Sequence, residues 1–248
     1  MEIILGLDIS THCIGMTICS VEDNMISVME ITHLRLNVPK KIKGVESLLI
    51  KTNLLKDKLK TFTQYHISKV IIEEPQINPN KELTNMLLKL NGMISVVIYE
   101  VLGIVPNFIT SKTARMFALP ELMGIRKFNK NGVPYKTEHI INSIKNNELV
   151  LFGGYQWDIS KKYLIFNIIS TQFPNIKWLY NSDGDLSNEN FDACDSLICI
   201  LGFLKKEKYN TSQPLITTYN CENIDNKTII NYTFTFCDNS FDKKIIID

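Results

Sequence analysis

The sequence predicts an α/β fold in which one mixed sheet carries antiparallel and parallel strands and is flanked by helices. Three short strand-like runs open the chain and are separated only by turn residues, which favours antiparallel pairing. Two further strand-like runs each follow a long stretch with apolar residues at helical spacing, which favours parallel crossovers. The predicted order is three strands, a helix, a strand, a helix, a strand and a helix.

The elements of this core follow one another closely. The opening strands are expected at 2–8, 14–20 and 26–34, with polar or small residues at both turns. A helix over 44–64 leads to a strand at 68–73, which Pro75 ends. A longer amphipathic helix starts near Asn80 and runs to residue 102, before a strand at 105–110 and the start of a helix at 111–117.

The rest of the chain predicts an insertion and an extension. Residues 120–134 are rich in Gly, Pro, Asn and Lys and indicate a loop, with helices expected at 136–146, 160–172 and 190–206. The sequence becomes rich in strand-forming residues in three runs at 215–219, 228–237 and 244–247, which predicts an added hairpin or edge extension. We expect one main domain over 1–212, with an insertion at about 120–187, and a β-rich extension over 213–248.

Composition limits the possible functions. A chain of 248 residues with 45% hydrophobic residues can bury one sizeable core. No apolar run approaches the roughly 20 residues needed to span a bilayer, and no secretory leader is visible, so a cytoplasmic protein without membrane contact is expected. The six cysteines show no metal-binding spacing, which predicts reduced, buried thiols and no zinc site.

Charge is informative through its distribution, since the net charge is only +1. Lysines crowd residues 40–60, and smaller basic clusters follow at 112–115, 126–136 and 205–208. Any one cluster is typical of a solvated helix face. Several of them beside an acidic centre could instead follow a phosphate backbone, and the excess of lysine over arginine favours contacts that do not read bases.

Four carboxylates carry the chemistry. Asp8 lies in the first apolar strand, where alternation puts Gly6 and Asp8 on one face. Glu73 ends the strand 70–73, although Glu74 next to it is a possible substitute. Asp192 and Asp195 share one face of a buried helix. Acids at the edge of a core need neutralisation, and hard oxygen ligands suit Mg²⁺, with Mn²⁺ able to substitute.

These motifs resemble those of the RuvC-like nucleases of the ribonuclease H fold. Residues 4–15 are similar to the first motif, an aspartate in the first strand followed by small polar residues and a glycine. Residues 70–73 resemble the second motif, residues 88–92 the helix segment after it, and residues 192–197 the last motif. The motifs occur in the order of the family, over roughly residues 2–118 and 188–204.

The resemblance implies a Holliday junction resolvase or a related structure-selective endonuclease. Asp8, Glu73, Asp192 and Asp195 would be the ligands of two Mg²⁺ ions, and the products would carry 5′-phosphate and 3′-hydroxyl ends. Asp192 stands where some relatives have histidine and could also help to activate water. Relatives also use a lysine near the scissile phosphate, for which Lys136 is the candidate. The expected partners are branched or four-way junction DNA and a second copy of the chain.

Two other classes stay open at the level of sequence. Actin-like ATPases and sugar kinases also begin with an aspartate and a glycine turn, but they need a second phosphate loop and a glycine-rich nucleoside motif. The only double glycine here is Gly153–Gly154, with no aspartate motif to partner it. A non-catalytic nucleic-acid-binding module is the third class, and the presence of all four acids argues against it. The Lys-, Ile- and Asn-rich composition favours an AT-rich source such as a bacteriophage.

Overall fold

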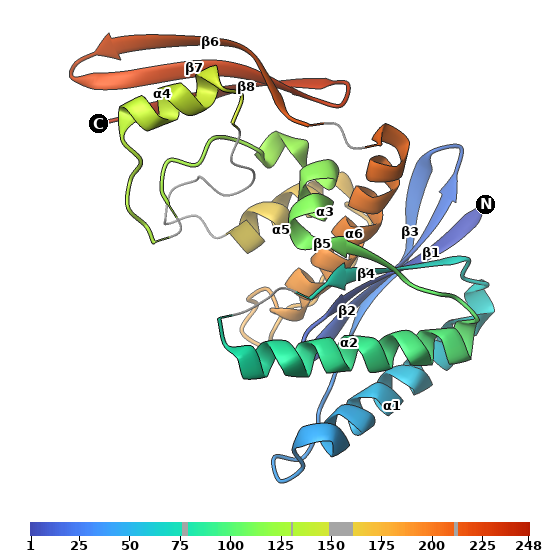
Figure 1. Cartoon of the computed structure of the whole chain (residues 1–248). Coiled ribbons are helices and arrows are strands. Elements are labelled where there is room, and N and C mark those ends of the chain that lie inside the picture. Colours follow the sequence, from blue (N-terminus) through green and yellow to red (C-terminus); the bar gives the residue numbers. More distant parts are fainter. Residues whose placement is uncertain (76–78, 130, 149–160, 211–212) are drawn as a thin grey trace. The chain divides into compact units, whose positions relative to one another are not determined.

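The computed structural model describes the chain except for residues 76–78, 130, 149–160 and 211–212. It consists of two compact units (Figure 1). The first unit holds Met1–Ala114 and Lys161–Phe203, and the second holds Arg115–Ser160 and Leu204–Asp248. The double glycine at 153–154 and the predicted helix start at Ser160 lie outside the described residues. The functional division into residues 1–212 and 213–248 stays a prediction.

The first unit is built on a five-stranded mixed sheet with the strand order β3-β2-β1-β4-β5. Strands β1, β2 and β3 pair antiparallel through tight turns, whereas β4 pairs parallel with β1 on one side and with β5 on the other. The predicted fold class is confirmed, and the strand limits differ from the expected ones by one or two residues. The strands are β1 (Glu2–Ile9), β2 (Cys13–Glu22), β3 (Met25–Arg35), β4 (Lys69–Glu74) and β5 (Asn107–Thr110).

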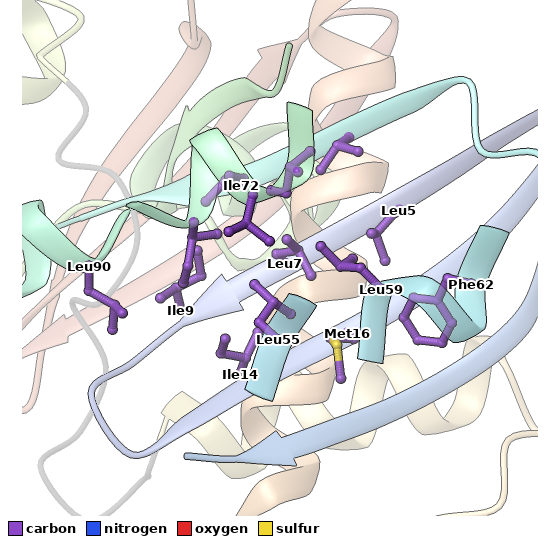
Figure 2. Packing of buried hydrophobic residues seen from close by; sticks show 14 of the residues in the cluster. Leu5, Leu7, Ile9, Ile14, Met16, Leu55, Leu59, Phe62, Ile72 and Leu90 are labelled. Carbon is purple, nitrogen blue, oxygen red and sulfur yellow. The ribbon is translucent and has the colours of Figure 1, made fainter. Parts of the chain in front are cut away.

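Helices α1 (Gly44–Phe62) and α2 (Lys81–Leu102) cover one face of this sheet. Leu5, Leu7 and Ile72 from the strands pack with Leu55 of α1 and Leu90 of α2 in one buried cluster (Figure 2). The short 3-10 turn η1 (Thr63–Tyr65) follows α1. Alternation along β1 thus sends its leucines into this core and leaves Gly6 and Asp8 for the opposite face.

The ends of α2 follow ordinary capping chemistry. The Asn80 side chain accepts hydrogen bonds from the backbone N–H groups of Glu82 and Leu83, and Gly103 closes the helix in the left-handed conformation. By length and composition alone, α2 is able to cross a membrane, so the expectation that no segment could do so was wrong. One such helix is weak evidence for a span, and Leu90 and Ile94 of α2 lie in the core described above.

Helix α6 (Glu189–Tyr209) lies on the opposite face of the sheet. Helix α5 (Lys161–Gln172) packs on its first turn, where Phe191 makes edge-to-face contacts with Tyr163 and Phe166. Asn190 anchors the preceding loop through two hydrogen bonds. Its side chain donates to the carbonyl of Leu179 and accepts from the N–H of Leu179. The predicted helix over 190–206 is confirmed.

The second unit has its own core and sheet. Strands β6 (Leu215–Ile224), β7 (Lys227–Phe236) and β8 (Asn239–Ile247) form a three-stranded antiparallel sheet rather than an edge extension of the first one. Its apolar face packs with α4 (Thr137–Lys145). The predicted loop over 120–134 is only partly one, because η2 (Pro120–Leu122) follows α3 (Ser111–Ala118), and Met123 and Ile125 are buried in this core.

Candidate metal centre

Two neighbouring parallel strands bring the first two acids together. Leu7 of β1 pairs with Ile72 of β4, so that Asp8 and Glu73 follow at adjacent positions of the two strands. Because Leu7 and Ile72 point into the α1–α2 core, the next residue on each strand points to the face that α6 covers. Asp8 and Glu73 are therefore neighbours on one face, near the carboxyl ends of β1 and β4.

Asp195 of α6 completes the cluster. Carboxylate oxygens of Asp8, Glu73 and Asp195 all lie within 4.8 Å of one another, and each residue is half-buried. We call these three residues the acidic triad. Among the residues that the structure describes, it is the one group of three His, Cys, Asp or Glu side chains with this geometry. Glu74 is exposed and outside the triad, so the geometry selects Glu73 of the two glutamates.

Two glycines allow α6 to approach the sheet this closely. A Cβ atom on Gly15, which pairs with Asp8, would lie 2.0 Å from the backbone oxygen of Asp192. A Cβ atom on Gly6 would lie 2.3 Å from the backbone oxygen of Ser196. Both positions must be glycine because the obstructing atoms belong to the helix backbone. The glycine after the first turn, visible in the sequence, thus sets the distance between Asp8 and Asp195.

A buried hydrogen bond fixes the register of α6 on the sheet. The hydroxyl groups of Thr17 on β2 and Ser196 on α6 lie 2.7 Å apart, and both residues are fully buried. Each hydroxyl also contacts the carbonyl of Ala193. Since buried hydroxyls are costly without partners, this arrangement favours a single position of Asp195 along the helix direction.

The donor set of the triad fits a hard divalent cation. All three donors are carboxylates, and they come from three elements that other contacts already hold in place. Three carboxylates so close together repel one another unless a cation or protons neutralise them. Oxygen-only coordination by half-exposed carboxylates suits Mg²⁺ or Mn²⁺.

Asp192, the fourth predicted acid, lies one helical turn before Asp195 and is not part of the triad. Burial raises the pKa of its carboxyl group, while a hydrogen bond from the Cys13 thiol and the charge of Lys162 act in the opposite direction. Burial also raises the pKa of Cys13 to about 12, so its thiol stays protonated and donates to Asp192. The sequence predicted Cys13 only as a small buried residue and missed this contact.

Glu189 at the start of α6 is a further acid that the sequence did not indicate. Hydrogen bonds from the Ser187 hydroxyl, a backbone N–H and the Arg35 side chain lower its pKa to about 2. The Arg35 guanidinium, at the end of β3, approaches Glu189 Oε1 with Nη2 at 2.5 Å and Nε at 2.7 Å. This ion pair ties the first turn of α6 to the edge of the sheet, and its partners are 154 positions apart in the sequence.

Two lysines are relevant to the catalytic role that the sequence predicted for Lys136. Lys136 precedes α4 as its N-cap residue, as the sequence predicted, and belongs to the second unit. Lys162 of α5 belongs to the first unit, its charge acts on Asp192, and its Nζ atom lies 5.7 Å from the centre of the Phe191 ring. Lys162 was missed because nothing in the sequence distinguishes it from other helix-surface lysines.

Comparison with known proteins supports the fold. No protein-family model and no curated protein sequence matches this chain. RuvC from Thermus thermophilus aligns with a TM-score of 0.52 and 10% identity, covering 86% of this chain and 100% of that one. The same protein in complex with a Holliday junction substrate gives a TM-score of 0.50 and 9% identity over 87% and 100%. The chain therefore has a RuvC-like ribonuclease H fold.

Two other alignments are too weak to carry an argument. The yeast mitochondrial Holliday junction resolvase aligns at 12% identity over 84% of this chain and 81% of its own, with a TM-score of 0.42. An Aquifex aeolicus Ppx/GppA phosphatase aligns at 13% identity over 84% and 92%, with a TM-score of 0.35. Function must therefore be argued from the site itself.

Proposed function

We propose that this chain is a metal-dependent endonuclease that hydrolyses phosphodiester bonds in branched DNA, four-way junctions above all. The observation that carries the proposal is the convergence of Asp8, Glu73 and Asp195 from two strands and a distant helix. The fold shared with RuvC, which has been seen with a Holliday junction substrate, supports junction DNA as the substrate class. The proposed products carry 5′-phosphate and 3′-hydroxyl ends.

In this proposal the triad holds Mg²⁺ or Mn²⁺, and Asp192 contributes to a second ion. When bound, two such ions supply a nucleophilic water and stabilise the charge that develops on the departing 3′ oxygen. Asp8, Glu73 and Asp195 would hold the first ion at a fixed place relative to the sheet. A carboxylate has two oxygens, so Asp192 can accept the Cys13 hydrogen bond and still contribute a ligand.

The proposed positive group beside the reacting phosphate is Lys162. It shares a compact unit with the triad and interacts with Asp192, which lies one turn from Asp195. Lys136, the residue that the sequence favoured, stays a competing candidate. A lysine ammonium acts here as a point charge that attracts phosphate oxygens.

We further propose that two copies of the chain associate through α2. Leu88, Val96 and Tyr99 lie on one exposed side of this helix, with 49%, 57% and 60% of their surface exposed. An apolar stripe of this kind is unfavourable in water and typical of a covered interface. A symmetric dimer also matches the two strands that must be cut to resolve a four-way junction.

A cleavage assay on a synthetic four-way junction tests this function. Linear duplex, flap and single-stranded substrates run beside it, in Mg²⁺, Mn²⁺ or EDTA, with wild type and Asp8→Asn. We expect paired nicks in the junction that require both the metal and Asp8, with 5′-phosphate ends that a ligase can seal.

Other results would redirect the proposal in defined ways. Cleavage of flaps or single strands would retain the chemistry and reject the junction as preferred substrate. No cleavage of any DNA by the folded protein with either metal would reject the endonuclease and call for tests of nucleotide hydrolysis and DNA binding. Equal cleavage by Asp8→Asn would show that the triad is not the active site.

A further inference from the structure

The lysines of residues 40–60 fall into groups with different environments. Lys51 is buried in α1, where its Nζ donates to the carbonyl oxygen of Thr11 at 2.6 Å. Three others form ion pairs with Glu100, Glu30 and Asp57 at 2.8, 3.3 and 2.8 Å; they are Lys56, Lys58 and Lys60. Lys40, Lys41 and Lys43 are exposed, and none of them has an ion pair with any residue that the structure describes.

A closed turn presents the first two of these lysines. The Ile42 N–H donates to the Pro39 carbonyl at 2.9 Å, so that Lys40 and Lys41 occupy the two central positions of a four-residue turn. The preceding Leu36 anchors the segment, because its side chain lies in the core and its N–H donates to the His12 carbonyl at 2.8 Å. We call residues 39–43 the lysine turn.

The segment that carries the lysine turn leaves the sheet at the same end of the strands as the acidic triad. Arg35, the last residue of β3, pairs with Cys13, while Asp8 pairs with Gly15 two positions along β2. Leu36 therefore lies two strands away from Asp8 across the sheet and about three residues further along the strand direction. Each of these two separations is roughly 10 Å. In Figure 1 the chain leaves β3 at this end and forms the loop that leads into α1. Leu36 is therefore within reach of a duplex bound at the triad, and the lysine turn begins three residues further along the chain.

The position of these charges is unfavourable for the protein alone. Lys43 is the N-cap residue of α1 and makes no capping hydrogen bond through its side chain. Positive charge beside a helix N-terminus is unfavourable, because the helix dipole is positive there. Glu46 is the one acid in the first turn of α1, against three lysines. A polyanion that contacts the lysine turn would offset this repulsion.

We propose that Lys40, Lys41 and Lys43 form a sequence-independent contact with the phosphate backbone of a DNA arm next to the cleaved bond. This inference rests on the proposed function, which supplies DNA as the ligand. Lysine ammonium groups at the tip of a closed turn bind phosphates as point charges and read no bases. The ion-paired lysines of α1 contribute little to the same binding, because nearby acids already neutralise them.

Salt-dependent binding with matched variants tests the lysine turn. Fluorescence anisotropy in EDTA, which prevents cleavage, follows a labelled four-way junction between about 50 and 300 mM salt. The test variant is Lys40→Gln with Lys41→Gln, and the control, with the same loss of charge, is Lys56→Gln with Lys60→Gln. Each lost phosphate contact lowers the magnitude of the slope of log K against log salt by about 0.9. Relative to 1 M salt, this is a loss of about eightfold in affinity at 0.1 M salt.

The proposal expects a slope change near 1.8 for the test variant and less than a twofold change in affinity for the control. A test variant that binds like wild type, or a control that loses as much, overturns the lysine turn while leaving cleavage by wild type intact. If wild type binds DNA through these lysines but never cuts it, the nuclease proposal fails and the lysine turn stands. If the folded wild type binds no DNA, both fail.

Discussion

Replacing Gly15 by alanine should move Asp195 away from Asp8 and Glu73. The added Cβ atom would lie 2.0 Å from the backbone oxygen of Asp192 and 2.7 Å from the backbone nitrogen of Ala193. Ordinary contact begins at 3.4 Å, so α6 must move away from β2 by about 1.4 Å, the difference between 3.4 and 2.0 Å. Because the obstructing atoms are backbone, no change of side-chain rotamer in α6 can relieve the clash.

The expected effect is large on function and moderate on stability. A shift of about 1 Å in a catalytic group can cost roughly a hundredfold in rate, so we expect at least that loss in single-turnover cleavage of a junction. Overpacking costs about 1–3 kcal/mol, which is roughly 3–9 °C in Tm for a chain of this size. Mn²⁺ affinity, measured by isothermal titration, should fall in parallel because Asp195 moves away from Asp8 and Glu73.

Two further variants make this prediction decisive. Gly6→Ala creates a contact of 2.3 Å with the backbone oxygen of Ser196 and should act in the same direction. Asp8→Asn removes a ligand without moving α6, so it should abolish cleavage and keep the wild-type Tm or raise it in EDTA. A Gly15→Ala protein that folds, binds Mn²⁺ and cuts like wild type would refute the argument that glycine sets the triad distance.

Three other predictions concern separate features. The hydrogen bonds from Ser187, a backbone N–H and Arg35 lower the pKa of Glu189 to about 2 from an ordinary value of 4.5, so these contacts stabilise the fold above pH 4.5 and are lost as the pH falls toward 2. In Glu189→Gln, thermal melts should show a loss of about 1 kcal/mol at pH 7 that disappears near pH 2, and a constant difference would contradict the assignment. Val96→Glu with Tyr99→Glu should convert a dimer into a monomer in light-scattering chromatography, whereas an unchanged dimer would exclude the exposed side of α2 as the interface. Lys162→Gln should slow cleavage at least about tenfold with near-wild-type DNA affinity, and a larger effect of Lys136→Gln would return the role to the residue that the sequence favoured.

The sheet of the first unit was predictable because its signals are local. Apolar runs, tight turns and helical spacing sufficed to predict the order of the elements along the chain and which strands are antiparallel or parallel, and the family resemblance agreed with them. The second unit was less predictable, because the sequence shows that residues 215–247 form strands but not what they pair with. Their own sheet buries Phe234 and Phe236, and it packs with α4, which ends 70 residues before the first of these strands begins.

The candidate site shows the same division between local and long-range information. Strand ends and helix spacing were enough to select Asp8 and Asp195, whereas Glu73 was separated from Glu74 only by the geometry of the folded site. The contacts of Cys13 with Asp192 and of Arg35 with Glu189 join residues more than 150 positions apart. No spacing rule indicates such pairs, because they depend on where α6 lies on the sheet.

Single-turnover cleavage of a four-way junction by Asp195→Asn, beside wild type, is the most direct test of the central claim. Asp195 is the one member of the triad that α6 contributes, more than 120 positions after Glu73, so only the folded site explains its role. We predict that in Mg²⁺ the variant retains wild-type DNA affinity and less than about 1% of the cleavage rate. Cleavage at the wild-type rate by Asp195→Asn would contradict a metal centre built from Asp8, Glu73 and Asp195.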